Sequence, residues 1–152
     1  MTNLTTDFIL CMLIPLRKHY LLLPKVSIAE VIPMPLTTKE TQSPSHYIGK
    51  YQWKSYPLTI LDLEYLIEKK APSRRVASKL CVLYGAHNNQ LKAYALACYG
   101  PPQLLYLNES ALKLIDDDVA ESVFLHCKVH IANKVAYIPN LEKLEEIVLQ
   151  QL

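Results

Sequence analysis

The chain consists largely of short apolar runs that are separated by polar or proline-containing segments. Residues 8–16 and 20–32 are apolar and flank the polar segment 17–19, which predicts two strands joined by a turn without glycine. Pro24 interrupts the second run. Because proline lacks a backbone N–H, it predicts a bulge or a bend at an unpaired edge. The first part of the chain is therefore expected to be a β-hairpin.

Similar apolar runs continue toward the C-terminus. The charged, proline-containing segment 68–75 is the best candidate for a linker. After it, strands are predicted at 76–85 and 91–100, followed by a hairpin at 123–138. At 141–152 the apolar residues recur at helical spacing. The whole pattern predicts a mainly β protein with a C-terminal helix.

Many short strands with few helices between them favour small β-barrels over a parallel sheet, because parallel neighbours need long crossover connections. Two barrels packed side by side, each of roughly 60 to 70 residues, fit the length of the chain. We expect one domain over residues 1–152, with a first barrel at about 8–68 and a second barrel plus the helix at about 76–152. The pattern leaves open whether terminal segments cross from one barrel to the other.

The charge balance excludes some classes of partner. The net charge is only +2, from 16 Lys and Arg against 14 Asp and Glu, which gives no electrostatic footprint for nucleic acid or an anionic membrane. The four cysteines are widely spaced in apolar runs, as expected for buried thiols in a reducing compartment. The run at 8–16 is shorter than the roughly 18 residues that span a bilayer, and nothing around it resembles a secretory signal. We predict a cytoplasmic protein without membrane insertion.

His126, Cys127 and His130 are the first residues to test as metal ligands. On a strand, the two histidines share a face but lie about 13 Å apart, which is too far for one ion. Cys127 would point the other way, with Leu125 and Val129. A polar face over an apolar face is therefore expected here, and no metal site.

A catalytic constellation is also missing from the sequence. Asp116, Asp117 and Asp118 lack the spacing of a calcium loop and are expected in a solvated loop. The chain has only three glycines and contains no phosphate-binding loop, nucleophile elbow or zinc-protease motif. We therefore expect no catalytic residues and no cofactor, and predict that the protein is not an enzyme.

Ten tyrosines and the basic pieces EKK and SRR allow one alternative, a small-barrel protein that binds single-stranded nucleic acid by stacking. That function needs aromatic and basic residues interleaved on one surface. Here the basic residues cluster in turns and in the linker, while most tyrosines lie in strands with core-like neighbours. Binding to nucleic acid is therefore kept only as the alternative.

The segment KYQWKSYPLTILDLEYLI, residues 50–67, is the most informative stretch. A turn near Lys54 and Ser55 would join two short strands. Asp62 follows the second strand and is placed to cap a short helix. Trp53 fits equally well as an apolar plug at the rim of a barrel or as a recognition residue.

This segment and the run LLLPKVSIAEVI at 21–32 together resemble the CheW-like family of chemotaxis coupling domains. That family has an early strand of this kind, then a glycine that opens the motif G-x-x-N-x-R-G, with an aspartate 13 residues after the glycine. Gly49 and Asp62 have the same spacing of 13. Gln52 stands where the family has Asn, Lys54 where it has Arg, and Ser55 where it has Gly.

The resemblance implies two small SH3-like five-stranded β-barrels packed side by side, and a non-catalytic adaptor. Its partners would be the regulatory domain of a CheA-type histidine kinase and the cytoplasmic tip of a methyl-accepting chemoreceptor, so the protein would be recruited to membrane-associated receptor arrays. Residues 99–108, YGPPQLLYLN, resemble the type IV pilus (Pil-Chp, ChpC-like) branch, which controls twitching motility. The implied partner-binding residues are Glu30, Val31, Gln52, Trp53, Lys54 and Ser55, and the implied structural residues are Gly49, Asp62 and Leu63.

The departures from the family motif concern geometry more than polarity. Lysine cannot reproduce the bidentate fork of a guanidinium, and serine does not adopt positive φ as freely as glycine. The resemblance therefore implies a specialised or auxiliary coupler whose usual receptor contact is weakened or replaced.

Overall fold

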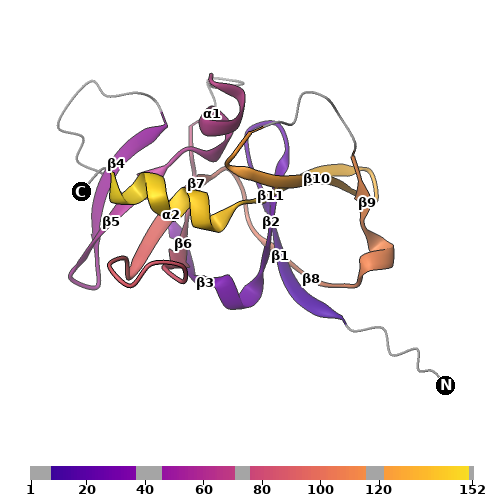
Figure 1. Cartoon of the computed structure of the whole chain (residues 1–152), viewed down its shortest axis with the longest axis horizontal. Helices are drawn as coiled ribbons and strands as arrows, with labels where there is room; N and C mark the ends of the chain where they lie inside the picture. Colours follow the sequence, from indigo (N-terminus) through magenta and orange to yellow (C-terminus); the bar gives the residue numbers. More distant parts are fainter. Residues whose placement is uncertain (1–7, 37–45, 71–75, 116–121, 151–152) are drawn as a thin grey trace.

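The computed structural model describes residues 8–36, 46–70, 76–115 and 122–150 (Figure 1). Most of these residues lie in strands, as the apolar runs predicted. In chain order the elements are β1 (Ile9–Pro15), β2 (Tyr20–Pro24), the 3-10 turn η1 (Lys25–Ser27), β3 (Ile28–Pro33), β4 (Tyr47–Trp53), β5 (Tyr56–Leu61), α1 (Leu63–Glu68), β6 (Lys79–Tyr84), β7 (Ala93–Cys98), β8 (Gln103–Leu107), the 3-10 turn η2 (Glu109–Ala111), β9 (Lys113–Leu114), β10 (Leu125–Ile131), β11 (Lys134–Pro139) and α2 (Leu141–Leu149).

The strands form two sheets that interleave the two halves of the chain. One sheet has six strands in the order β8-β1-β2-β11-β10-β9, and the other has five in the order β3-β6-β7-β5-β4. Most neighbours are antiparallel, but β2 pairs in parallel with β11, and β5 pairs in parallel with β7. The first two strands therefore belong with the last four. The barrel boundaries of 8–68 and 76–152 do not describe the sheets, because the terminal segments do cross over.

Pro24 marks the place where the chain passes from one sheet to the other. It ends β2, and after the single turn η1 the chain enters β3 in the five-stranded sheet. The run at 20–32, expected as one bent strand, is thus two strands in two sheets. Since proline cannot donate a hydrogen bond to a sheet, it suits this strand end. The six-stranded sheet also has one strand more than the expected five.

The continuous apolar runs are explained by strands that are buried on both faces. In β7 every residue is buried: Tyr94, Leu96 and Cys98 join a central core, whereas Ala93, Ala95 and Ala97 join a core enclosed by the five-stranded sheet. The six-stranded sheet likewise encloses a third core, which contains Cys11, Leu13, Leu22, Leu107, Val129, Ile131 and Ala136. The central core lies between the sheets and also takes residues from both helices, including Leu63, Leu66, Leu144 and Val148.

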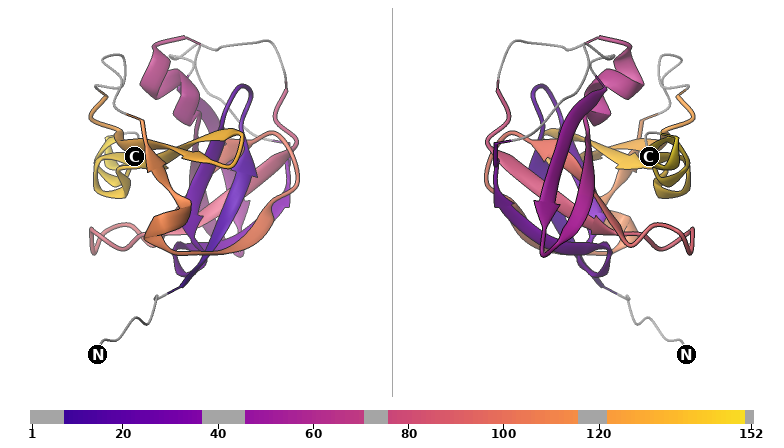
Figure 2. Two further views of the ribbon diagram at one scale, coloured as in Figure 1. Left: turned by 90° about the vertical axis from the view of Figure 1, so that its right-hand side faces the viewer. Right: turned by 90° about the vertical axis from the view of Figure 1, so that its left-hand side faces the viewer.

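Each helix holds a turn that belongs to the other sheet. Glu64 of α1 is fully buried and accepts hydrogen bonds from the backbone N–H groups of Arg17 and Lys18, at 2.8 and 2.9 Å, in the turn between β1 and β2. α2 lies across the front of the five-stranded sheet in Figure 1. Its buried Glu145 accepts from the N–H groups of Ala86 and His87, at 3.0 and 2.9 Å, in the turn between β6 and β7. The two carboxylates thus fasten the two sheets together reciprocally. Figure 2 shows the two turns at opposite ends of the molecule.

Candidate functional site

The turn between β4 and β5 consists of Lys54 and Ser55. Trp53 pairs with Tyr56 across it, and both turn residues have positive φ, at 49° and 68°. Two positive φ values define the tight hairpin turn for which Asn-Gly is the preferred sequence. A lysine and a serine therefore hold a backbone conformation that glycine would adopt without strain. Both side chains are exposed at this turn.

Trp53 links the two edges of the five-stranded sheet. β4 and β3 are the outermost strands of that sheet. The indole Nε1 of Trp53, on β4, donates a hydrogen bond of 2.9 Å to Oε1 of Glu30, on β3. The same oxygen lies 3.9 Å from Nζ of Lys54, whose ammonium sits 4.9 Å from the Trp53 ring centre. Trp53 also packs on the core enclosed by the five-stranded sheet, so it closes the open end of that sheet.

The structure thus brings Glu30, Trp53 and Lys54 into contact, and it places the other predicted partner-binding residues differently. Gln52 is exposed next to this group. Val31 is half-buried and packs against the central core, on the inner side of β3. Val31 is therefore not part of one continuous exposed surface with Gln52.

Asp62 and Leu63 begin α1. The Asp62 carboxylate is the N-cap and accepts a hydrogen bond of 3.2 Å from the N–H of Tyr65, as its position after a strand predicted. Its other oxygen lies 2.6 Å from Nη2 of Arg17. The residue pattern does not indicate this long-range ion pair. Leu63 is fully buried in the central core.

Gly49 sits at an irregularity of β4. The register against β5 shifts between Tyr47 and Gly49, and Gly49 has a φ of 153°. A glycine relaxes the steric limits at such a bulge.

The cluster of Arg17, Asp62 and Glu64 is electrostatically unusual. Burial raises the pKa of Glu64, although the backbone N–H groups of Arg17 and Lys18 and the Arg17 guanidinium act to lower it.

A surface that sequence reasoning missed lies on β1 and β8. Leu10 pairs directly with Tyr106, and Met12 with Leu104, so the four side chains share one side of the sheet. Leu104 is 54% exposed and Tyr106 is 72% exposed, whereas Met12 packs against the central core. We call these four residues the β1–β8 face. It is an uncovered extension of the side that elsewhere faces the other sheet, and β8 is an edge strand.

β1 is apolar at every position and β8 at every position after Gln103, so the sequence pattern does not reveal the β1–β8 face. In QLLYL, residues 103–107, Leu105 and Leu107 face the core enclosed by the six-stranded sheet, and their neighbours are exposed. Nothing in the sequence distinguishes the two sets. An apolar strand residue left exposed beside an unpaired edge is typical of an interaction surface.

The residues weighed as metal ligands do not form a site. His126 and His130 are exposed on β10, as predicted. Cys127 packs with Val129 toward the core enclosed by the six-stranded sheet. Leu125 joins the central core instead, because a bulge lies between residues 125 and 127. Among the described residues no group of three or more His, Cys, Asp or Glu side chains could share an ion. Asp116, Asp117 and Asp118 lie outside the described residues.

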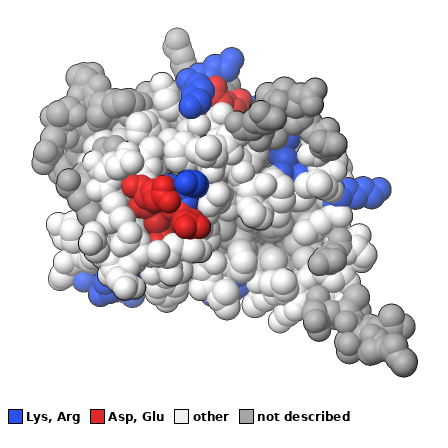
Figure 3. All heavy atoms as spheres, in the orientation of Figure 1, with Lys and Arg blue, Asp and Glu red and all other residues white. Residues whose placement is uncertain are grey.

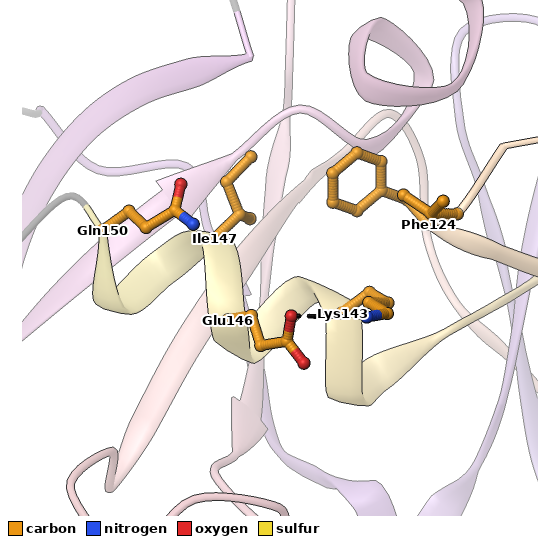
Figure 4. A pocket seen from close by; sticks show the side chains of 6 residues that line it. Phe124, Lys143, Glu146, Ile147 and Gln150 are labelled. Carbon is orange, nitrogen blue, oxygen red and sulfur yellow. Dashed lines mark hydrogen bonds and ion pairs between the residues drawn. The ribbon is translucent and has the colours of Figure 1, made fainter.

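A small groove separates α2 from the segment before β10 (Figure 4). Its volume is about 200 Å³, and Phe124, Lys143, Glu146 and Ile147 contribute to its walls. Lys143 and Glu146 form an ion pair at 3.5 Å on the exposed side of the helix. The groove thus combines one exposed ion pair with apolar walls.

Three of the ten tyrosines are buried and are not available for stacking on bases. Tyr94, Tyr99 and Tyr137 are buried. The face drawn in Figure 3 carries small groups of charged side chains, one of them acidic and located over α2, on a surface that is otherwise uncharged. The face shown in Figure 3 therefore differs from the basic, aromatic stripe of single-strand binders.

No protein-family model matches the chain, and no curated protein matches it. Among solved structures, it is similar to the crystal structure of the scaffolding protein TtCheW from Thermoanaerobacter tengcongensis. The TM-score is 0.71 and the sequence identity is 14%, over 95% of this chain and 92% of that chain. The chain has the CheW fold. The mainly β architecture of two sheets with a C-terminal helix is thereby confirmed.

The fold is shared although only 14% of the residues are identical. In the described part of the chain, none of the helices is both long and apolar enough to cross a bilayer. Among the exposed hydrophobic side chains of the described residues, Leu104 and Tyr106 lie on one side of β8 and belong to the β1–β8 face.

Proposed function

We propose that this protein is a non-catalytic scaffold that couples a chemoreceptor to a CheA-type histidine kinase. Two features support the proposal: the similarity to a scaffolding protein of the same fold, and two separate candidate docking surfaces, one on each sheet. A scaffold needs two such surfaces and no reactive centre. Such a protein would act in the cytoplasm, at membrane-associated receptor arrays.

The β1–β8 face is the observation that carries the proposal. Tyr106 and Leu104 are large and exposed, and Leu104 pairs with Met12, which packs against the central core. An amphipathic helix can lay its apolar stripe into such a surface, with anchors at i, i+3, i+4 and i+7. The occupant we propose is the helical hairpin at the cytoplasmic tip of a methyl-accepting chemoreceptor.

The second surface is the end of the five-stranded sheet around Glu30, Gln52, Trp53, Lys54 and Ser55. It lies on the other sheet from the β1–β8 face. The hydrogen bond between Trp53 and Glu30 holds the β4–β5 turn in place. Gln52, Lys54 and Ser55 are exposed on this rigid support. We assign this surface to the regulatory domain of the kinase. A preorganised turn binds with a smaller loss of conformational entropy than a flexible one.

Binding measurements with both partners test the proposal. Leu104→Glu combined with Tyr106→Glu should abolish binding of a receptor-tip fragment and leave binding of the kinase regulatory domain unchanged. Lys54→Glu should weaken kinase binding alone. Leu114→Glu is the matched control, since Leu114 is 70% exposed on the other edge strand of the same sheet. If the unmodified protein binds neither partner at tens of micromolar, the proposal is wrong.

The type IV pilus branch is the finer form of this proposal, and it depends on the resemblance of residues 99–108. Deletion of the gene should then impair twitching while swimming stays normal. Receptor, kinase or pilus-motility genes beside this gene would support the assignment. A defect confined to swimming would place the protein in a flagellar pathway.

A further inference from the structure

The β6–β7 turn carries a histidine that is held by the buried carboxylate of α2. Nδ1 of His87 lies 3.0 Å from Oε2 of Glu145. The same carboxylate accepts the backbone N–H groups of Ala86 and His87, one at each oxygen, at 3.0 and 2.9 Å. Because backbone donors fix both oxygens, the carboxylate keeps its place beside the ring. The imidazole of His87 is therefore held in one orientation.

This contact determines which nitrogen of the ring carries the proton. Glu145 accepts hydrogen bonds at both oxygens, so Nδ1 of the neutral His87 ring is the donor and Nε2 keeps its lone pair. The side chain of His87 is 43% exposed, whereas that of Glu145 is 2% exposed. Since the Nδ1 edge faces the buried carboxylate, the exposed edge of the ring is that of Nε2. His87 thus presents a nucleophilic nitrogen to the solvent.

A carboxylate on Nδ1 makes Nε2 more reactive. It raises the basicity of the ring and stabilises the positive charge that the ring acquires when Nε2 forms a new bond. Histidine side chains can act as covalent nucleophiles for this reason. His126 and His130 are also exposed, but among the described residues neither of them contacts a carboxylate. The activation is therefore specific to His87 within this comparison.

The surroundings of His87 restrict the charge of a reagent that can approach it. Figure 3 shows an acidic group over α2, the helix that holds the ring, and Glu142 and Glu146 are exposed there. A strongly anionic reagent is repelled by this surface. Phosphoramidate and a protonated phosphohistidine carry a positive charge on the nitrogen bonded to phosphorus, which offsets part of the phosphoryl charge. Acyl phosphates have no such positive charge.

We propose that Nε2 of His87 accepts a phosphoryl group from a donor with a P–N bond. The Nε2 lone pair attacks phosphorus, and the P–N bond of the donor breaks. The leaving nitrogen departs with the electron pair of that bond, as ammonia from phosphoramidate or as a neutral imidazole from a phosphohistidine. Nδ1 keeps its proton, so the phosphorylated ring is cationic and the Glu145 carboxylate balances it. This modification lies outside both docking surfaces, and the proposal stands without the scaffold function.

Reaction of the full chain with phosphoramidate tests the proposal. His87 should be phosphorylated about tenfold faster than His126 or His130, the factor that corresponds to roughly 1.4 kcal/mol from a hydrogen bond to a charged group. Only the Nε2 isomer should form at His87, because Nδ1 is occupied by its hydrogen bond. Mass spectrometry of peptides locates the phosphoryl group, and nuclear magnetic resonance identifies the isomer. Acetyl phosphate, the control donor, should react more slowly at His87.

A phosphorylated histidine-kinase domain, used in place of phosphoramidate, distinguishes the two sources of the phosphoryl group. Transfer from the domain would identify a protein donor. Transfer from phosphoramidate alone would identify a small-molecule donor.

Two variants of α2 test the role of the carboxylate. Glu145→Gln should slow phosphorylation of His87 about tenfold in samples that circular dichroism shows to be folded, and Glu146→Gln, the matched control, should not slow it. If Glu145→Gln does not fold, the comparison of His87 with His126 and His130 in the unmodified protein decides. Nitrogen-15 resonance of the neutral His87 ring should show the proton on Nδ1. A proton on Nε2, equal rates at the three histidines, or a mixture of isomers at His87 would overturn the proposal.

Discussion

Replacing Glu145 by glutamine should strongly destabilise the fold, although the change alters only one atom of the side chain. The Glu145 carboxylate is almost fully buried and accepts one hydrogen bond at each oxygen, from the N–H groups of Ala86 and His87. His87 Nδ1 also lies 3.0 Å from one of these oxygens. Glutamine keeps one acceptor oxygen and places an NH₂ group where the second oxygen was. One backbone N–H then faces another donor.

The magnitude follows from the lost contacts. A hydrogen bond to a charged group contributes about 1.5–3 kcal/mol, and a buried donor left without an acceptor costs about 1–3 kcal/mol. We therefore expect Glu145→Gln to lower the free energy of unfolding by about 3 kcal/mol. For a chain of this length, such a loss corresponds to a decrease in Tm on the order of 10 °C.

Glu146→Gln is the matched control on the same helix. Glu146 is half-exposed, and within the described residues its ion pair is with Lys143, at 3.5 Å. An exposed pair of this kind contributes little, so the control should change the free energy of unfolding by less than about 0.5 kcal/mol. Urea unfolding followed by circular dichroism compares the two variants at equal m-values. If they unfold at the same urea concentration, the role assigned to Glu145 in fastening α2 to the β6–β7 turn is wrong.

Three further changes test other parts of the structure. Ser55→Gly should raise the free energy of unfolding by about 1 kcal/mol, because the φ of 68° strains a non-glycine residue. Ser78→Gly, at an exposed position without positive φ, should not raise it. Urea unfolding compares the two variants. Tyr94→Phe should leave stability equal or raise it by about 1 kcal/mol in a thermal melt, because the buried hydroxyl has no hydrogen-bond partner among the described residues; a large loss would reveal a hidden partner. Since the pKa of His19 is lowered from 6.5 in the fold, the stability that neutral His19 contributes is present above that pH and is lost as the pH falls below it. His19→Phe should flatten this part of the pH profile of unfolding, and an unchanged slope would contradict the shift.

Local features of this fold could be predicted from the sequence because neighbouring residues determine them. Asp62 follows a strand and precedes a helical pattern, so its capping role is visible in a window of a few residues. The turn at Lys54 and Ser55 was also visible, from polarity and spacing. The pairing of β2 with β11 was not, because residues more than 100 positions apart meet there and both strands are apolar on both faces.

The glutamates that fasten the sheets show a different limit. Glu145 lies four residues after Leu141 and three before Val148, on the helical stripe that is buried. That position could have identified it as a buried carboxylate. What the sequence does not contain is its partner, a pair of backbone N–H groups in a turn 58 and 59 residues away. Backbone donors leave no trace in residue identity.

The place of β11 between β2 and β10 has a consequence for synthesis on the ribosome. The five-stranded sheet has all its strands once residue 98 has emerged, whereas the six-stranded sheet needs residues 134–139 to fill its middle. The β1–β2 hairpin, with its apolar strands, must wait until β11 has been translated. During that interval its unpaired strand edges can bind chaperones, or the same hairpin of a chain on the next ribosome of the same messenger RNA.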